Sequence, residues 1–493
     1  MSQIHRVHFI GIGGSGMSGI ALVAHERGLA VTGSDLKESR YMRSLLRADV
    51  SVAVGHDASH VEDPSIDVVV VSAAVPEKNP EYRAAVERGL EIWPRARMLA
   101  HLSKGHRTLA VAGTHGKTTT SSMLAAALDR LGADPTFLIG GVLDGYDSTA
   151  RTGKGPFFVV EADESDGSFT WLDPSLAIVT NIEADHLDHY GGLDEIEGAF
   201  ASFLGKVVPG GTLVVCGGDP ALAALAEKSG RKVRSYGTEG TPSVRCEPKG
   251  IQDFDVVFED GRRCSVRLPV SYGVHNMLNA TAVMTALDEL GFEPAAAAAA
   301  LGAFSGVRRR FDRIGVADGV SVVDDYGHHP TEIAATLKAA RALGHRKVHV
   351  LFQPHRYTRT EALMEEFGRA FDDADTVSLM EVYPAGEAPI PGINSDAMAD
   401  ALRAHDGAVE VRVIHRRSEV PAAMAAAAAQ GDLVVTMGAG DVTVLAPLVL
   451  EELRQREAER LEAAPAPAAP QDVPAPAAPA PAPAPQEAGD AGL

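Results

Sequence analysis

Cysteine is scarce in this chain of 493 residues. It occurs only at Cys216, Cys246 and Cys264, an odd number without the spacing of a metal-binding motif. These features disfavour a disulfide scaffold and suit the reducing cytoplasm. We expect all three cysteines to be packing residues.

Positive charge and long apolar runs are also lacking. The chain has 45 Lys and Arg residues against 66 Asp and Glu residues, a formal net charge of -21, and no long Lys/Arg run. A nucleic-acid or anionic-membrane surface needs clustered positive charge, so neither is expected. No apolar run reaches the ~20 residues of a spanning helix, and the N-terminus lacks the anatomy of a signal peptide. We expect a soluble cytoplasmic protein, without membrane insertion, whose partners are small molecules or proteins.

Strand-like runs rich in Val and Ile alternate with longer Ala/Leu/Glu-rich segments of helical pattern almost throughout the chain. This alternation predicts stacked βαβ units with parallel sheets, so the class is α/β. The length predicts three domains, which we place at residues 1–106, 107–309 and 310–462. Within the second, the turn-rich segment from "GRKVRSYG" to "GRRCSVRLPVSYG" is expected to form an accessory hairpin region.

The composition changes abruptly after Glu462, because residues 463–493 consist mostly of Ala and Pro. Such a segment buries no core, and we expect an extended, disordered tail. A solubilising spacer is favoured over a docking peptide, whose partner the composition does not name.

A glycine-rich loop lies near the start of the chain. Gly11, Gly13 and Gly16 of "GIGGSGMSG" follow an apolar run and precede a helical pattern, and Asp35 comes roughly 20 residues later, as in dinucleotide-binding folds. A uridine diphosphate fits this loop as well as NAD does, because both present a pyrophosphate to a helix N-terminus. A purely structural loop is the alternative.

A second glycine loop, "VAGTHGKTTT", is a shortened variant of the phosphate-binding pattern, Gly113-x-x-Gly116-Lys117-Thr118. Its backbone N–H groups and the following helix favour phosphate oxygens. Lys117 neutralises their charge, and the Thr118 hydroxyl suits Mg²⁺. ATP or another nucleoside triphosphate is therefore the expected cofactor, against the alternative of a chance glycine turn.

Two later strand patterns, in "FFVVEADESDGSF" and "LAIVTNIEADHLDHY", end in acidic residues and histidine. The carboxyl ends of parallel strands face the ligand crevice, which places Glu161 and His186 near the triphosphate. Glu161 is a natural oxygen ligand for Mg²⁺, and His186 is a less usual one. We expect the neighbouring Asp163, Asp166 and Asp188 to be structural.

Taken together, these motifs make the chain resemble the Mur ligases of bacterial cell-wall synthesis, and within them the branch that adds L-alanine to UDP-N-acetylmuramate. The resemblance extends to about Glu462 and also includes "YGVHNMLNA", "RRRFD", "DDYGHHPTEI" and "QPHRYTRT". It implies an N-terminal Rossmann-like UDP-binding domain, a central P-loop ATPase domain and a C-terminal Rossmann-like domain that closes over the amino acid. The implied cofactors are ATP and Mg²⁺.

Matched motif by motif, the resemblance also implies the residues of the site. The nucleotide would be bound by Gly113, Thr114, Gly116, Lys117, Thr118, Thr119, His275, Asn276, Asn279 and Arg310. The UDP-sugar would be bound by Gly11, Gly13, Gly14, Gly16, Ser34, Asp35 and Ser72. Alanine would be bound by Tyr326, His328, His355, Arg356 and Arg359, and the metal by Thr118, Glu161 and His186. The catalytic residues would be Lys117, Arg310, His328 and His355.

The implied reaction has two steps. The lactyl carboxylate takes the γ-phosphoryl group of ATP, and the amine of alanine then displaces phosphate from the acyl phosphate. His328 or His355 is a candidate base, although both could serve only as hydrogen-bonding groups. Arg359 is expected to hold the alanine carboxylate, against the alternative that it is solvated or paired with Glu361 or Glu365. Two other functions stay open: a recycling ligase that adds a preformed tripeptide to the same UDP-sugar, and a non-catalytic sensor of UDP-sugar and ATP.

Overall fold

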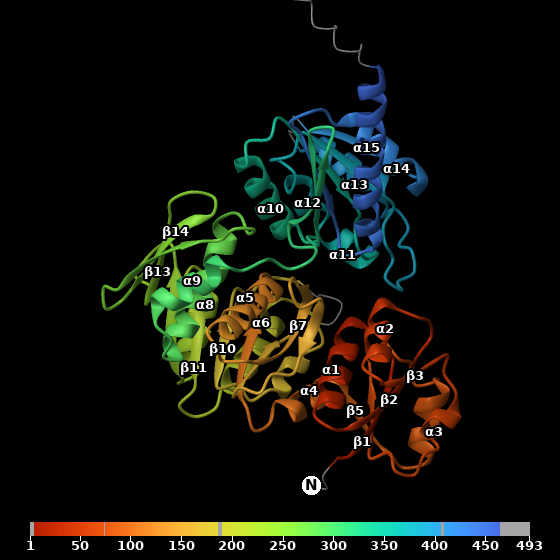
Figure 1. Ribbon diagram of the computed structural model, residues 1–493, viewed down its shortest axis with the longest axis vertical. Helices are drawn as coiled ribbons and strands as arrows, with labels where there is room; N and C mark the ends of the chain where they lie inside the picture. The colour runs from red at the N-terminus through yellow and green to blue at the C-terminus, as the bar shows by residue number, and fades with distance from the viewer. Residues whose placement is uncertain (1–3, 73, 186–189, 406–408, 464–493) are drawn as a thin grey trace, which may run out of the picture.

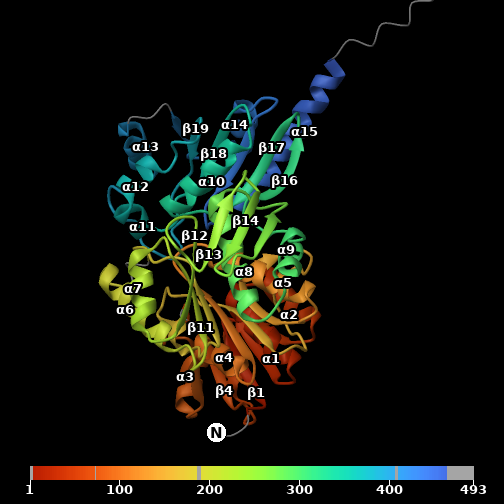
Figure 2. The same ribbon diagram turned by 90° about the vertical axis from the view of Figure 1, so that its left-hand side faces the viewer.

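The computed structural model describes residues 4–72, 74–185, 190–405 and 409–463 (Figure 1). His186, Asp188 and the Ala/Pro tail from residue 464 onward lie outside the described residues. Within them, the chain forms three α/β bodies, each built on its own sheet. Figure 2 shows the first body at the end that carries the N-terminus and the third at the opposite end. This three-domain α/β arrangement is the predicted fold class, and the precise domain limits stay predictions.

The first sheet is parallel and has the order β3-β2-β1-β4-β5. The strand order reverses between β1 and β4, so their carboxyl ends open a crevice for a ligand. Its strands are β1 (Arg6–Ile10), β2 (Ala30–Asp35), β3 (Ser51–Val54), β4 (Val68–Val71) and β5 (Glu91–Pro94). Its helices are α1 (Ser15–Glu26), α2 (Arg40–Arg47), η1 (Ala58–Val61), α3 (Pro80–Glu87) and α4 (Arg95–Ser103).

The central sheet has the order β15-β14-β13-β12-β11-β10-β6-β9-β7-β8. Its strands are β6 (Arg107–Ala112), β7 (Thr136–Leu143), β8 (Ser148–Arg151), β9 (Phe157–Glu161), β10 (Leu176–Val179), β11 (Thr212–Cys216), β12 (Lys232–Gly237), β13 (Val244–Pro248), β14 (Asp253–Phe258) and β15 (Arg263–Arg267). Its helices are α5 (Lys117–Arg130), η2 (Ser168–Trp171), α6 (Leu193–Gly205), α7 (Pro220–Lys228), α8 (Val274–Glu289) and α9 (Pro294–Gly302).

The turn-rich segment of the central domain contains hairpins, as expected, and its strands also continue the main sheet. Strand β12 pairs in parallel with β11, and β13 in parallel with β12. Only β13, β14 and β15 form the antiparallel hairpins. The segment therefore extends the main sheet. The N–H and C=O groups of β12 pair with those of β11.

The third sheet has the order β16-β17-β21-β18-β19-β20, with β16 antiparallel at one edge. Its strands are β16 (Asp312–Ala317), β17 (Val320–Asp325), β18 (Val348–Phe352), β19 (Thr376–Leu379), β20 (Glu410–Val413) and β21 (Leu433–Met437). Its helices are α10 (Pro330–Ala342), α11 (Tyr357–Ala362), α12 (Met364–Arg369), α13 (Ser395–Ala404), η3 (Arg417–Glu419), α14 (Val420–Ala427), η4 (Asp441–Val444) and α15 (Leu445–Ala463).

The first two domains share an apolar core. One cluster of buried side chains runs from Phe9 and Ile20 of the first domain to Leu138 and Phe158 of the second. Helix α1 can lie close to β7 and β8 because Gly19 has no side chain, and a Cβ there would be 2.9 Å from Leu138 Cδ2. The two buried apolar clusters of the third domain contain only residues from that domain.

The cysteines are free, as expected, and burial raises the pKa of each thiol. None of the helices in the described parts of the chain is both long enough and apolar enough to cross a bilayer.

Candidate active site

Two cavities flank the loop that joins β6 to α5. The first, of about 480 Å³, lies where the three domains meet. It is lined by Ser15 and Arg40 from the first domain, Lys117 from the second and Tyr326 and Arg359 from the third. The second, of about 620 Å³, lies between the central and C-terminal domains. The loop therefore forms part of the wall of both cavities.

Glycine conformations shape the phosphate loop. Gly116, with a φ of 82°, precedes the first turn of α5, and a Cβ there would be 2.8 Å from Asn279 Oδ1. Gly113 has a φ of 127°, and a Cβ there would overlap Thr180. Both positions require glycine, and α5 begins at Lys117 with its N-terminal N–H groups at the loop.

Lys117 lies folded over this loop. Its Nζ donates to the carbonyl oxygens of Gly113 (2.7 Å) and Thr114 (3.1 Å) and to Glu164 Oε1 (2.7 Å). Burial lowers the pKa of Lys117, but the charges of Glu164 and Asp163 outweigh it and raise the pKa. Burial raises the pKa of Glu164 to about 7, against the attraction of Lys117. Sequence reasoning missed Glu164, although it stands three residues after Glu161 in a motif already singled out.

The two predicted metal ligands that the structure describes lie together. Thr118 Oγ1 donates to Glu161 Oε1 at 3.0 Å, while Glu161 Oε2 accepts from the N–H of Gly140 (2.7 Å) and from Ser121 Oγ (3.4 Å). A hydroxyl and a carboxylate beside a phosphate loop are oxygen donors of the kind that Mg²⁺ prefers. The contribution of His186 stays a prediction.

The second cavity contains the rest of the predicted nucleotide group. Thr119, His275, Asn276 and Asn279 line it, and Arg310 lines both cavities. Its wall also includes aromatic and apolar side chains from Pro220, Tyr236, Tyr272 and Leu278. Burial lowers the pKa of His275 to about 4, so this imidazole is neutral at pH 7. A partly apolar chamber next to a phosphate loop suits a planar base.

All five predicted alanine-binding residues line the first cavity: Tyr326, His328, His355, Arg356 and Arg359. Arg359 pairs with Asp185 of the central domain, Nη2 to Oδ1 3.1 Å, and both side chains are 9% exposed. The ion pair of Arg359 is thus with Asp185, while Glu365, one of the alternative partners, pairs with Arg369. The arginine fork is thus already oriented by a carboxylate across the domain junction.

Glu332, on the first turn of α10, joins the two chambers and was not predicted. Its Oε1 lies 3.6 Å from Arg310 Nη1 and 3.5 Å from His115 Nδ1, and its Oε2 lies 3.4 Å from His328 Nδ1. Burial raises the pKa of Glu332, but these cationic and imidazole neighbours outweigh it and hold the pKa well below its ordinary value. Burial lowers the pKa of His328 to about 3, so this side chain is a neutral hydrogen-bonding group. In the sequence "HHPTE", Glu332 is recognisable only as the third residue of a helix. The groups that its carboxylate contacts become visible only in the folded structure.

The opening glycine loop lies at the crevice of the first sheet. The N–H groups of Gly11 and Ile12 both donate to the carbonyl of Ser34, at 2.9 and 3.0 Å. The N–H of Gly13 donates to Asp35 Oδ2 at 2.8 Å, so this carboxylate also holds the loop. Ser72, at the end of β4, lies against Gly11. The predicted residues therefore converge on one end of the sheet.

Ser34 differs from the other predicted residues in pointing into the domain. Its side chain is fully buried, and its Oγ donates to Glu81 Oε2 at 2.6 Å. Glu81 also contacts the rings of His8 and His60, at 3.1 and 2.7 Å. Ser34 thus contacts the loop through its backbone carbonyl, which accepts the hydrogen bonds from Gly11 and Ile12.

These features define a three-domain α/β protein with a phosphate-binding loop at the domain junction. Three family profiles match it in order: "Mur ligase family, catalytic domain" at residues 6–107, "Mur ligase middle domain" at 111–287 and "Mur ligase, glutamate ligase domain" at 309–440. The chain belongs to the Mur ligase family.

Among its relatives is the UDP-N-acetylmuramate–L-alanine ligase of Myxococcus xanthus, 46% identical over 91% of this chain and 95% of that one. A crystal structure of UDP-N-acetylmuramate–alanine ligase from Thermotoga maritima is similar with a TM-score of 0.75 and 29% identity, over 93% of this chain and 99% of that one. A murein peptide ligase from Psychrobacter arcticus is similar with a TM-score of 0.69 and 26% identity, over 91% and 99%.

Proposed function

We propose that this protein is an ATP-dependent ligase that joins L-alanine to the lactyl carboxylate of UDP-N-acetylmuramate, releasing ADP and phosphate, in peptidoglycan precursor synthesis. The observation that carries the proposal is the first cavity, into which all three domains contribute side chains. The M. xanthus relative named for this reaction, which is similar over nearly the whole length of both chains, supports it.

The first step is the transfer of the γ-phosphoryl group to the lactyl carboxylate. The loop N–H groups and the start of α5 hold the phosphates, and Lys117 exchanges its contacts with Gly113 and Thr114 for phosphate oxygens. Mg²⁺, held by Thr118, Glu161 and His186, would neutralise phosphate charge. Arg310 reaches the same chamber from the domain junction and stabilises the charge on the transferring group.

The second step is the attack of the alanine amine on the acyl phosphate. Arg359 holds the alanine carboxylate through two N–H groups, and its contact with Asp185 fixes the direction of the fork. His328 and His355, whose ring centroids are 6.0 Å apart, face the same space. Burial lowers their pKa values to about 3 and 4, so both are neutral and each offers a lone pair to the ammonium group.

Phosphate release from ATP tests this function. We expect release in the presence of UDP-N-acetylmuramate and L-alanine, little release without alanine, and none from Lys117→Ala. Replacing alanine by the tripeptide L-alanyl-γ-D-glutamyl-meso-diaminopimelate distinguishes the recycling ligase, because that enzyme would prefer the tripeptide. Absence of turnover with either acceptor would support the sensor instead.

A further inference from the structure

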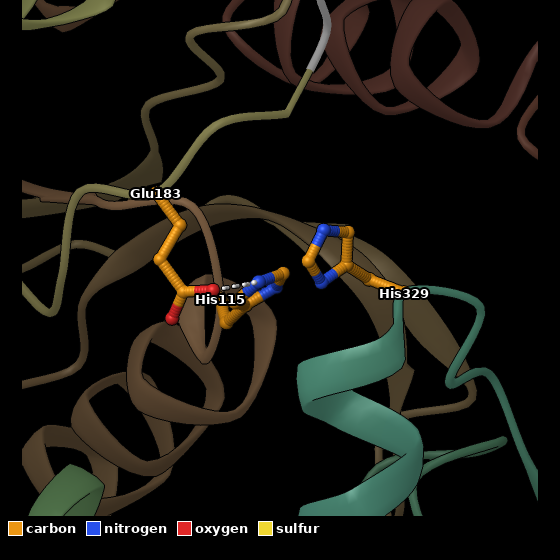
Figure 3. Close-up of side chains that lie close together, drawn as sticks. All are labelled: His115, Glu183 and His329. Carbon is orange, nitrogen blue, oxygen red and sulfur yellow. Dashed lines mark ion pairs between the residues drawn. The ribbon is translucent and has the colours of Figure 1, made fainter. Parts of the chain in front are cut away.

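Three side chains outside the predicted magnesium position meet at the junction of the central and C-terminal domains (Figure 3). His115 belongs to the phosphate loop, Glu183 follows β10, and His329 precedes the first turn of α10. Each offers one ligand atom, and these atoms all lie within 4.8 Å of one another. The cluster thus draws its members from two domains and three segments of the chain.

The contacts inside this cluster are looser than hydrogen bonds. His115 Nε2 lies 3.4 Å from Glu183 Oε2, and the rings of His115 and His329 are centred 4.6 Å apart. His329 is only 5% exposed. Neither His115 Nε2 nor His329 Nε2 has a hydrogen-bond partner among the described residues, and both atoms are buried. His115 Nε2 still has its ion pair with Glu183, but a buried nitrogen such as His329 Nε2 is uncommon in this state and points to a missing partner.

Each member of the cluster also contacts a residue of the first turn of α10. Glu183 Oε2 accepts from Thr331 Oγ1 at 2.8 Å, and His115 Nδ1 faces Glu332 Oε1 at 3.5 Å. His329 Nδ1 accepts a long bond, 3.3 Å, from the N–H of Thr331. His329 is therefore held by one long hydrogen bond and by its contact with the ring of His115.

Two imidazoles and one carboxylate form a donor set for Zn²⁺ and other transition-metal dications. Mg²⁺ prefers a shell of oxygen ligands, so a site with two imidazoles disfavours it. In a tetrahedral Zn²⁺ site with bonds of about 2.1 Å, ligand atoms lie roughly 3.4 Å apart. The pair formed by His115 and Glu183 already has this spacing, at 3.4 Å. Only the ring of His329 has to move closer, by on the order of 1 Å.

We propose that His115, Glu183 and His329 form a binding site for a transition-metal dication of the Zn²⁺ type, distinct from the magnesium position at Thr118 and Glu161. Because the ligands come from two domains, a bound ion ties the C-terminal domain to the phosphate loop. Occupancy then restrains the domain motion that turnover requires, and Zn²⁺ acts as an inhibitor.

The test measures Zn²⁺ binding to the full chain, without an affinity tag, by calorimetric titration in excess Mg²⁺. His329→Asn removes the imidazole, yet asparagine is a favoured residue before a helix and keeps the cap on Thr331. We expect this variant to lose at least about tenfold in Zn²⁺ affinity. His345→Asn, beyond the far end of α10, is the matched control and should bind as the unsubstituted protein does.

A second variant keeps the test decisive if His329→Asn folds poorly. Glu183→Gln retains an oxygen for Thr331 and removes the charge, and it should weaken Zn²⁺ binding to a similar degree. Inhibition of phosphate release by Zn²⁺ should weaken in parallel in both variants. Unchanged Zn²⁺ affinity in both, or displacement of the ion by excess Mg²⁺, would overturn the proposal. Activity with Mg²⁺ alone reports the proposed ligase function separately.

Discussion

Arg359 shows how a single side chain can be prepared for its ligand. Its guanidinium group is 9% exposed and already faces the carboxylate of Asp185. A planar fork held in this way loses little conformational freedom when a second carboxylate binds beside it. We therefore expect the proposed alanine site to be most sensitive to substitution at this residue.

We predict that Arg359→Lys raises the Michaelis constant for L-alanine by roughly 10- to 100-fold, because one charge-assisted hydrogen bond contributes about 1.5–3 kcal/mol. The constants for ATP and UDP-N-acetylmuramate should change far less, since the proposed sites for these substrates lie on the other domains. Steady-state kinetics that vary each substrate in turn measure the effect. Arg369→Lys is the control, because Arg369 pairs with Glu365 on an exposed helix face. An equal rise in all three constants would place the alanine carboxylate elsewhere.

His115 couples stability to pH at the same junction. Its folded-state pKa of about 9 lies above the ordinary value of 6.5, because Glu183 and Glu332 outweigh the effect of burial. Protonated His115 therefore stabilises the fold fully below pH 6.5, and this stabilisation is lost as the pH rises through 9. We expect His115→Gln to be less stable by about 2–3 kcal/mol at pH 6.5 and by much less at pH 9.5.

Urea unfolding of both proteins at several pH values, with a chelator present, measures this difference. His345→Gln is the control and should show no such pH dependence. If the difference in free energy of unfolding between His115→Gln and the unsubstituted protein were the same at every pH, His115 would not be protonated at this junction.

The residues that sequence reasoning found and missed differ in a simple way. Lys117, Thr118 and Glu161 could be predicted because a contiguous motif or a strand end places them at the phosphate loop. Glu164 contacts Lys117, and Glu332 contacts Arg310 and His115, all of which are far from these glutamates in sequence. No spacing rule encodes a contact between distant segments, whether they belong to one domain, as for Glu164, or to two, as for Glu332 and His115.

At the scale of elements, alternation of strand and helix patterns predicted the parallel sheets. The hairpins of the turn-rich segment were predicted, but the parallel pairing of β12 and β13 was not, because short, turn-rich strands look alike whether they form a hairpin or extend a sheet. Their pairing is decided by the edge of β11, far from any local signal. The glycine loop after β1 was easier to predict, because its conformation is set within a few residues.

We predict that Gly13→Ala weakens UDP-N-acetylmuramate binding by at least about tenfold and leaves ATP binding unchanged. The new Cβ would lie 2.9 Å from Asp35 Oδ2 and 3.0 Å from Met42 Cγ, so the loop has to shift away from its carboxylate anchor. Calorimetric titration with each ligand is the measurement. Gly198→Ala on α6 meets nothing within 4 Å and is the control. Unchanged UDP-sugar affinity would show that this loop does not contact the ligand.

At the scale of the whole molecule, the three domains are joined in two different ways. The first and second share a continuous apolar cluster through α1, β7 and β8. The third contacts the second through polar pairs, among them Arg359 with Asp185 and Thr331 with Glu183, and through the rings of Phe311 and Tyr272, but no buried apolar cluster of the described residues spans this junction. A hydrophobic core resists separation, whereas exchangeable polar pairs permit the domain motion that a three-substrate reaction needs.

The shared core has a calorimetric consequence. Side chains that pack in one cluster lose their contacts together, so the first two domains should absorb heat in a single cooperative transition. We predict two transitions in differential scanning calorimetry of the metal-free, nucleotide-free protein, one of them from the C-terminal domain alone. Gly19→Leu, which forces α1 away from Leu138 and Ala150, should divide the larger peak and leave the other in place. Three peaks in the unsubstituted protein would contradict this prediction, because each domain would then unfold separately despite the apolar cluster that the first two share.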